Sequence, residues 1–161
     1  MRYKTSLDKW AKVITISVAI LYAFIIGLQF FIIREVVIAI PIVITVALLV
    51  VYFIAFALRP IEYSLTDKQL IIHRLFKDVK IDREQIRDVA LLDKEKISWA
   101  IRNFGSGGLF GYFGKFSNKK LGGMTWFATR KDKTILVRTK NLQKIILTPD
   151  EPERLVSDYY A

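Results

Sequence analysis

The sequence predicts a membrane-anchored α+β protein, in which an N-terminal transmembrane helical hairpin is followed by a seven-stranded antiparallel barrel or sandwich and a C-terminal helix. Three observations lead to this fold class. Residues 13–58 are almost continuously apolar, side chains after Arg59 alternate between apolar and polar, and an amphipathic stretch containing prolines ends the 161-residue chain. We therefore divide the chain into a membrane anchor, residues 1–58, and a soluble domain, residues 59–161.

The apolar block is too long for one membrane crossing. As a single helix, residues 13–58 would extend roughly 70 Å, over twice the ~30 Å hydrocarbon core of a bilayer. Only Arg34 and Glu35 interrupt the block, at its middle. We expect two membrane-spanning helices, residues 13–33 and 36–58, with a tight turn at these two residues. The first segment is too long for the apolar core of a secretory signal, so we expect it to be a retained helix.

Basic residues lie mainly at one end of the predicted hairpin. Four precede the first helix and others follow Leu58, whereas only Arg34 lies between the helices. By the positive-inside rule, both termini and the soluble domain should face the cytoplasm. Apart from Arg34 and Glu35, the apolar block contains no ionisable acid or base, which argues against a transporter or a proton relay.

The soluble domain begins where the periodicity changes. From Ile61 onward, apolar and polar side chains alternate as in strands with one buried face. The predicted strands cover residues 61–66, 69–75, 79–82, 86–92, 124–130, 134–139 and 143–148. Their connections, apart from residues 93–123, are too short for crossover helices, so we expect an antiparallel meander. Two prolines then suit the start of a helix, and Leu155, Val156 and Tyr159 after them would lie on one helical face. These two features predict the C-terminal helix.

Seven strands in a four-plus-three arrangement followed by one helix resemble the pleckstrin-homology (PH) fold. Short motifs make the chain similar to bacterial PH-domain proteins; these are Pro60-Ile61-Glu62-Tyr63, residues 81–86, the glycine-rich residues 105–116, Trp126-Phe127-Ala128-Thr129 and Thr148-Pro149-Asp150. The resemblance covers residues 59–160, and an N-terminal pair of membrane helices also occurs in such proteins. It implies a multi-pass protein of the bacterial cytoplasmic (inner) membrane with a PH-like domain in the cytoplasm.

Residues 93–123 form an insertion that is unusually long for a compact domain. It contains seven of the eight glycines, interleaved with aromatic residues and lysines. Aromatic side chains suit a headgroup interface and lysines attract anionic lipid, so this insertion is the candidate lipid or partner contact. The candidate residues are Phe110, Tyr112, Phe113, Lys115, Lys119 and Lys120. In a structural alternative, the aromatic side chains close one end of the barrel and the glycines permit tight packing.

We expect no catalytic, metal or cofactor site. The chain has no cysteine, its single histidine, His73, reads as an ordinary strand residue, and its acidic residues are scattered. A phosphate-binding GK[ST] motif is absent, because Gly114-Lys115 is followed by Phe116. The first predicted hairpin turns at residues 67–68, too short a loop to wrap a phosphoinositide headgroup, so we do not expect such recognition.

Two classes of function remain. The first is a membrane-anchored PH-like interaction module that binds a protein partner, or another copy of the chain, at the cytoplasmic membrane face. The second is anionic-lipid binding or sensing through the insertion. The net charge of +10 fits an anionic partner, and since the domain follows membrane helices, lipid is a simpler explanation than nucleic acid.

Overall fold

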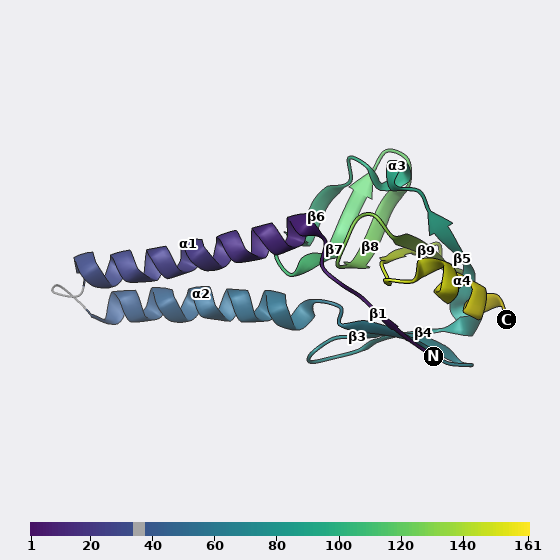
Figure 1. Ribbon diagram of the computed structural model, residues 1–161, viewed down its shortest axis with the longest axis horizontal. Coiled ribbons are helices and arrows are strands. Elements are labelled where there is room, and N and C mark those ends of the chain that lie inside the picture. Colours follow the sequence, from purple (N-terminus) through teal and green to yellow (C-terminus); the bar gives the residue numbers. More distant parts are fainter. Residues whose placement is uncertain (34–37) are drawn as a thin grey trace.

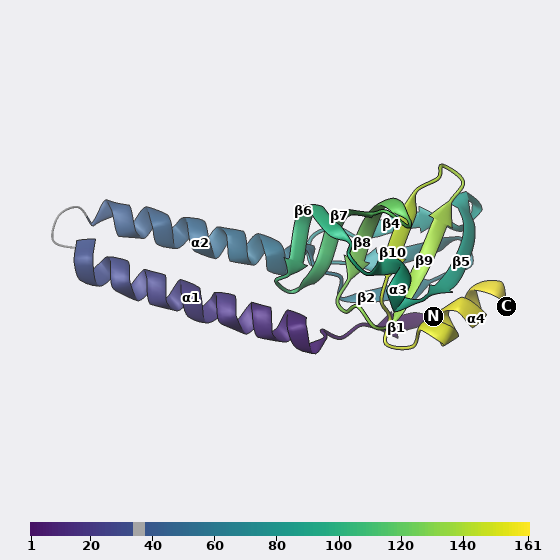
Figure 2. The same ribbon diagram turned by 90° about the horizontal axis from the view of Figure 1, so that it is seen from above.

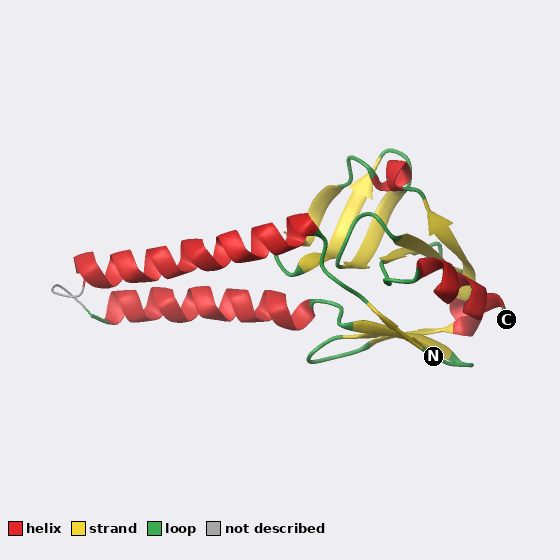
Figure 3. Cartoon of the chain, viewed as in Figure 1, coloured by secondary structure: helices red, strands yellow, loops and turns green. Residues whose placement is uncertain are grey.

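A computed structural model describes residues 1–33 and 38–161 of the chain. Two long helices lie side by side and extend from one end of a β-rich domain (Figure 1 and Figure 3). Helix α1 covers Lys9–Ile33 and helix α2 covers Ala39–Leu58. Both are long and apolar enough to be candidate membrane spans. The predicted turn at Arg34 and Glu35, and the predicted start of the second helix at residue 36, lie outside the described residues.

Polar side chains fix the beginning of α1 and join the two helices. The carboxylate of Asp8 accepts a hydrogen bond from Ala11 N–H at 2.7 Å and caps the first turn, so α1 begins before the predicted residue 13. Near the other end, the side-chain amide of Gln29 donates to Thr45 Oγ1 at 2.7 Å and to Pro41 O at 3.2 Å. The amide is buried between the helices, where such bonds hold the pair together.

The first sheet contains four antiparallel strands in the order β1-β2-β3-β4. They are β1 (Arg2–Lys4), β2 (Glu62–Leu65), β3 (Gln69–His73) and β4 (Val79–Asp82). The last three are predicted from the sequence, whereas β1 is not, because three residues carry no readable periodicity. Strand β1 pairs with β2 and places Tyr3 opposite Tyr63. The division at Arg59 stays a prediction, but residues from both sides of it share this sheet.

The second sheet contains six strands in the order β5-β9-β10-β8-β7-β6. They are β5 (Ile86–Leu92), β6 (Ile101–Gly108), β7 (Gly111–Asn118), β8 (Gly122–Ala128), β9 (Thr134–Thr139) and β10 (Lys144–Leu147). A single turn of 3-10 helix, η1 (Arg83–Gln85), connects the first sheet to the second.

Two expectations about the sheets are wrong. The seven-strand count is too low, because the described residues hold ten strands. Strand β1 adds one, and residues 93–123 hold the short helix α3 (Lys94–Ile97) and the β6–β7 hairpin rather than a loop. The meander also fails, since β8 pairs with β7 and, in parallel, with β10, whereas β9 pairs with β5 and β10. Strands β8 and β9 are joined by a short connection and run in opposite directions, as predicted. They are not neighbours in the sheet, however, because β10 lies between them.

Glycine conceals the β6–β7 hairpin from sequence patterns, because glycine is depleted in ordinary strands. Gly105 and Gly114 lie directly opposite each other, with φ angles of 109° and 119°. A Cβ atom on Gly114 would lie 2.2 Å from the carbonyl oxygen of Phe104. The two backbones therefore approach each other at a distance that only glycine permits.

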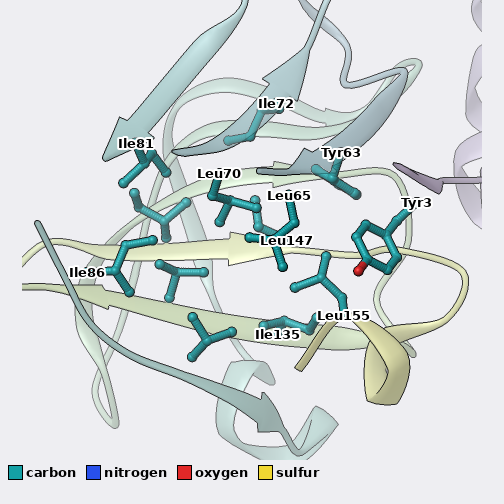
Figure 4. Packing of buried hydrophobic residues seen from close by; sticks show 13 residues of the cluster. Tyr3, Tyr63, Leu65, Leu70, Ile72, Ile81, Ile86, Ile135, Leu147 and Leu155 are labelled. Atoms are coloured by element: carbon teal, nitrogen blue, oxygen red, sulfur yellow. The ribbon is translucent and has the colours of Figure 1, made fainter. Parts of the chain in front are cut away.

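The predicted C-terminal helix is confirmed as α4 (Pro152–Tyr160), which packs against β5 and β9. Leu155 points from α4 into the main core between the two sheets (Figure 4). Tyr160 fixes the end of the helix, since its hydroxyl donates to Val89 O at 3.0 Å and accepts a hydrogen bond from Val89 N–H at 3.1 Å. The helix thus covers an open side of the core.

Candidate functional site

The aromatic residues of the predicted contact site face protein rather than solvent. Phe110, Tyr112 and Phe113 are each at most 7 % exposed. Tyr112 belongs to a second core around Trp126, and its hydroxyl donates to Asp8 Oδ1 at 3.3 Å. Burial, together with this carboxylate, raises the pKa of the Tyr112 phenol. These three aromatic side chains of the insertion are therefore packed inside the protein, as in the alternative in which they have a structural role.

The three lysines of the predicted site are exposed but lie in different places. Lys115 is in the middle of β7, where its Nζ donates to Thr125 Oγ1 at 2.8 Å. Lys119 and Lys120 are in the β7–β8 turn, and Lys120 Nζ donates to Glu95 O in α3 at 3.2 Å. The six predicted residues therefore do not form one site.

The tip of the β6–β7 hairpin docks on both long helices. The Phe110 ring packs edge-on against Tyr52 and Phe56 of α2, with ring centroids 4.8 and 5.3 Å apart. Its backbone N–H donates to Thr15 Oγ1 of α1 at 2.9 Å. These contacts hold Phe110 at a φ of 56°, which is uncommon for a residue with a side chain. The insertion thus joins the domain to the helix pair.

Replacing Thr15 with valine is expected to make the Phe110 amide exchange with solvent about fivefold to tenfold faster, because a hydrogen bond of this kind contributes about 1 kcal/mol. Hydrogen–deuterium exchange of the full chain in detergent measures the rate. Ser17→Ala, at an exposed position of α1, serves as the control. An unchanged rate in Thr15→Val would show that this bond does not hold the hairpin tip.

The exposed large apolar side chains of the insertion lie along the edge formed by β6, the last strand of its sheet. Of these six strands it lies nearest to the helix pair (Figure 1 and Figure 2). Three large apolar side chains are open to solvent there: Trp99 is 94 % exposed, Ile101 70 % and Phe104 77 %. Among the described residues, β6 pairs with β7 alone, so its other backbone edge is unpaired. The sequence shows these residues but not that they share a free edge.

The β3–β4 loop, residues 74–78, reaches the helix pair as well. The Leu75 N–H donates to Ala57 O in α2 at 3.3 Å, and the Phe76 ring packs edge-on against Phe53 at a centroid distance of 5.6 Å. Both loop side chains remain largely exposed. An apolar pair in a turn, with a basic residue on each side, is the signal by which the sequence could have revealed this contact.

The end of the domain that contacts the helices carries partly buried positive charge. The guanidinium of Arg59 lies over the rings of Phe56 and Phe110, 4.4 and 5.8 Å from their centroids. Arg74 lies 5.7 Å from the Phe127 centroid. Burial lowers the pKa of both arginines, but the guanidinium stays charged at neutral pH. This end therefore attracts anions.

His73 joins the β3–β4 loop to the first sheet. Its Nε2 lies 2.8 Å from Ser64 Oγ and its Nδ1 lies 2.9 Å from Asp78 Oδ2. The residue types match a hydrolase triad, but Ser64 is only 8 % exposed within β2, which leaves a substrate little access to its hydroxyl. We interpret these side-chain contacts between Ser64, His73 and Asp78 as structural support for the β3–β4 loop. In residues 1–33 and 38–161, no three His, Cys, Asp or Glu residues form a metal-binding group.

A comparison with protein families identifies the β-rich part of the chain. The family model described as bacterial PH domain matches residues 61–160, from the residue before β2 to the end of α4. This match confirms the resemblance that the sequence motifs predict. None of the curated proteins or solved structures matches the chain.

Proposed function

The chain belongs to the bacterial PH domain family, and on this basis we propose that it is a membrane-anchored PH-like interaction module. PH domains are generally non-catalytic interaction modules, so the proposed role is binding rather than catalysis, without a cofactor. The proposal has two parts: the helix pair anchors the domain, and the domain binds a partner at the membrane face.

Exposed apolar side chains support the anchoring. Both helices expose large apolar side chains along their surfaces. Examples that are more than half exposed are Phe24 and Phe31 in α1 and Val43 and Leu49 in α2. Such a continuous apolar surface is unfavourable in water but fits the hydrocarbon core of a bilayer, where a helix satisfies its own backbone hydrogen bonds. By the positive-inside rule, the basic residues at the domain end of the helices support a topology in which both termini and the domain lie on the cytoplasmic side of a bacterial inner membrane.

The observation that carries the binding proposal is the free edge of β6. Proteins usually protect such an edge with proline, charge or a covering element. Strand β6 has one charged residue, Arg102, but also presents Ile101 and Phe104, with Trp99 beside them. An extended protein segment would pair with the backbone and place its side chains against these residues. We therefore propose a protein partner, or another copy of the chain, that adds a strand to β6.

Anionic-lipid binding through the insertion is the second candidate function. It is favoured by the position of β6 next to the helix pair, since exposed Trp99 and Phe104 side chains suit a membrane interface. Lys115 on the neighbouring strand would add positive charge. Lipid would cover the apolar side chains but would not satisfy the regular backbone groups of the edge, which is why we place the protein partner first.

A photoreactive amino acid at position 104 of the full chain is expected to form a covalent adduct with a protein in bacterial membranes. Phe104 is 77 % exposed, so this substitution should leave the fold intact. Adding Ile101→Lys is expected to reduce the adduct yield about tenfold, because a lysine on an edge strand opposes strand addition. Gel electrophoresis and mass spectrometry measure the adduct, and the purified chain in vesicles shows whether the partner is another copy.

The matched control places the same photoreactive residue at Leu142, which is 80 % exposed in the turn between β9 and β10. Protein adducts of equal yield at both positions would contradict specific binding at β6. Lipid adducts alone at position 104 would also contradict it, and would favour the second candidate function.

A further inference from the structure

A groove lies between the two sheets, beside β4 and the face of β7 and β8. It has a volume of about 240 Å³. Six of its lining residues come from these strands: Val79, Lys80, Ile81, Lys115, Thr125 and Phe127. We term it the intersheet groove. Since β4 is the last strand of its sheet, the groove runs along a second free edge, distinct from that of β6.

The lining of the intersheet groove combines positive charge with an apolar wall. Lys80 and Lys115 are both exposed, and of the described residues that line the groove none is acidic. The carboxylates that flank Lys80 along the chain have other partners. Asp78 lies 2.9 Å from a histidine nitrogen, and Asp82 accepts a glutamine side-chain hydrogen bond at 2.8 Å. Two lysines beside apolar side chains are complementary to an anionic amphiphile.

The groove adjoins a second hollow on the side of the β3–β4 loop, because Lys80 lines both. This larger hollow, of about 690 Å³, is lined by Lys80 and by the β3–β4 loop, which contributes two basic residues, Arg74 and Lys77, and one acidic residue, Asp78. That loop contacts Phe53 of α2 through Phe76. Phe53 lies five residues before the end of α2, about 7.5 Å along the helix axis. The loop that lines this hollow therefore lies beside the last turns of the apolar helix.

We propose that the intersheet groove binds an anionic phospholipid of the cytoplasmic leaflet. Lys80 and Lys115 bind the headgroup phosphate, Arg74 and Lys77 extend the positive surface toward the membrane, and Phe127 contacts the apolar part of the lipid. Leu75 and Phe76 enter the acyl boundary next to α2. The inference rests on the proposed membrane anchoring but not on a partner at β6. It uses one lysine of the predicted site, Lys115, and residues of β4 that the sequence does not single out.

The test is native mass spectrometry of the full chain in detergent with added phosphatidylglycerol or phosphatidylcholine. The wild-type chain is expected to bind phosphatidylglycerol about 25-fold more tightly than phosphatidylcholine. The double variant Lys80→Ala/Lys115→Ala is expected to lose this preference, because each lysine beside an anionic headgroup contributes about fivefold. Lys80→Arg/Lys115→Arg should retain it, which separates loss of charge from loss of fold.

The matched control is Lys119→Ala/Lys120→Ala, which removes the same charge from the insertion but outside the groove. It should retain the lipid preference. Equal loss in both alanine pairs would overturn the proposal, as it would show a general charge effect. Competition by inorganic phosphate as effective as by phosphatidylglycerol would also overturn it, because the site would then bind a free anion. Alkaline extraction of cell membranes tests the anchoring separately, since release of the chain contradicts anchoring and leaves the lipid measurement unaffected.

Discussion

Replacing Gly114 with alanine is expected to lower the free energy of unfolding by about 2–6 kcal/mol. The added Cβ would lie 2.2 Å from Phe104 O and 2.8 Å from Gly105 Cα, both backbone atoms. The φ of 119° is also strained for any residue with a side chain. Backbone strain of this kind costs about 1–3 kcal/mol and forced overpacking a similar amount, so the β6–β7 hairpin should separate or the domain should unfold.

Chemical unfolding of the full chain in detergent measures this change through the fluorescence of Trp126, which is buried in the second core. Gly123→Ala is the matched control. It lies in β8, a Cβ there meets no atom within 4 Å, and it should change the free energy of unfolding by less than ~1 kcal/mol. Similar stabilities of the two variants would contradict the close pairing of β6 with β7.

Replacing Tyr3 with alanine is expected to destabilise the domain by about 3–5 kcal/mol, the range for removing a buried aromatic ring. Tyr3 is 3 % exposed, lies in the main core and donates a hydrogen bond to Asp158 Oδ2 at 2.6 Å (Figure 4). Burial, the hydrogen bond to Asp158 and its charge raise the pKa of the Tyr3 phenol, so the hydroxyl remains a donor at neutral pH. Strand β1, which is only three residues long and precedes α1, thus stabilises a domain whose other strands all follow α2.

Thermal or chemical unfolding of the full chain again gives the measurement. Tyr3→Phe keeps the ring and should cost only about 1–2 kcal/mol, the effect of the lost hydrogen bond to a charged group. Arg2→Ala, whose side chain is 77 % exposed, should cost less than ~0.5 kcal/mol. If Tyr3→Ala were as stable as Arg2→Ala, β1 would not be an integral strand. The expected result also means that a fragment starting at Arg59 is destabilised.

Prediction from sequence succeeds where one element carries its own periodicity. The alternation after Ile61 identifies β2 to β5 with small errors at the ends, and the spacing around Leu155 identifies α4. These patterns are local, because one face of each element is buried whatever its neighbours are. The neighbours themselves cannot be read this way, and the β8–β10 parallel pair is the clearest case.

The candidate site is predictable only in outline. The insertion is correctly singled out as unusual, but the sequence cannot tell that Phe110 is buried against α2 while Phe104 is exposed on an edge. Both are aromatic residues among glycines, and their exposure depends on which strand packs on which helix. Lys80 and Lys115 are far apart in the chain, and they line one groove only because the two sheets face each other.

The sequence by itself determines the two apolar helices, the strand-rich domain that follows them and the membership of that domain in the bacterial PH domain family. Hydrophobic length and periodicity are properties of a continuous stretch, so they need no partner to be recognised. Tertiary structure alone decides that residues 2–4 complete the first sheet, that the glycine-rich insertion becomes a hairpin docked on the helices and that β6 keeps a free edge. Each of these features depends on contacts between distant residues, whose energies appear only after the chain has folded.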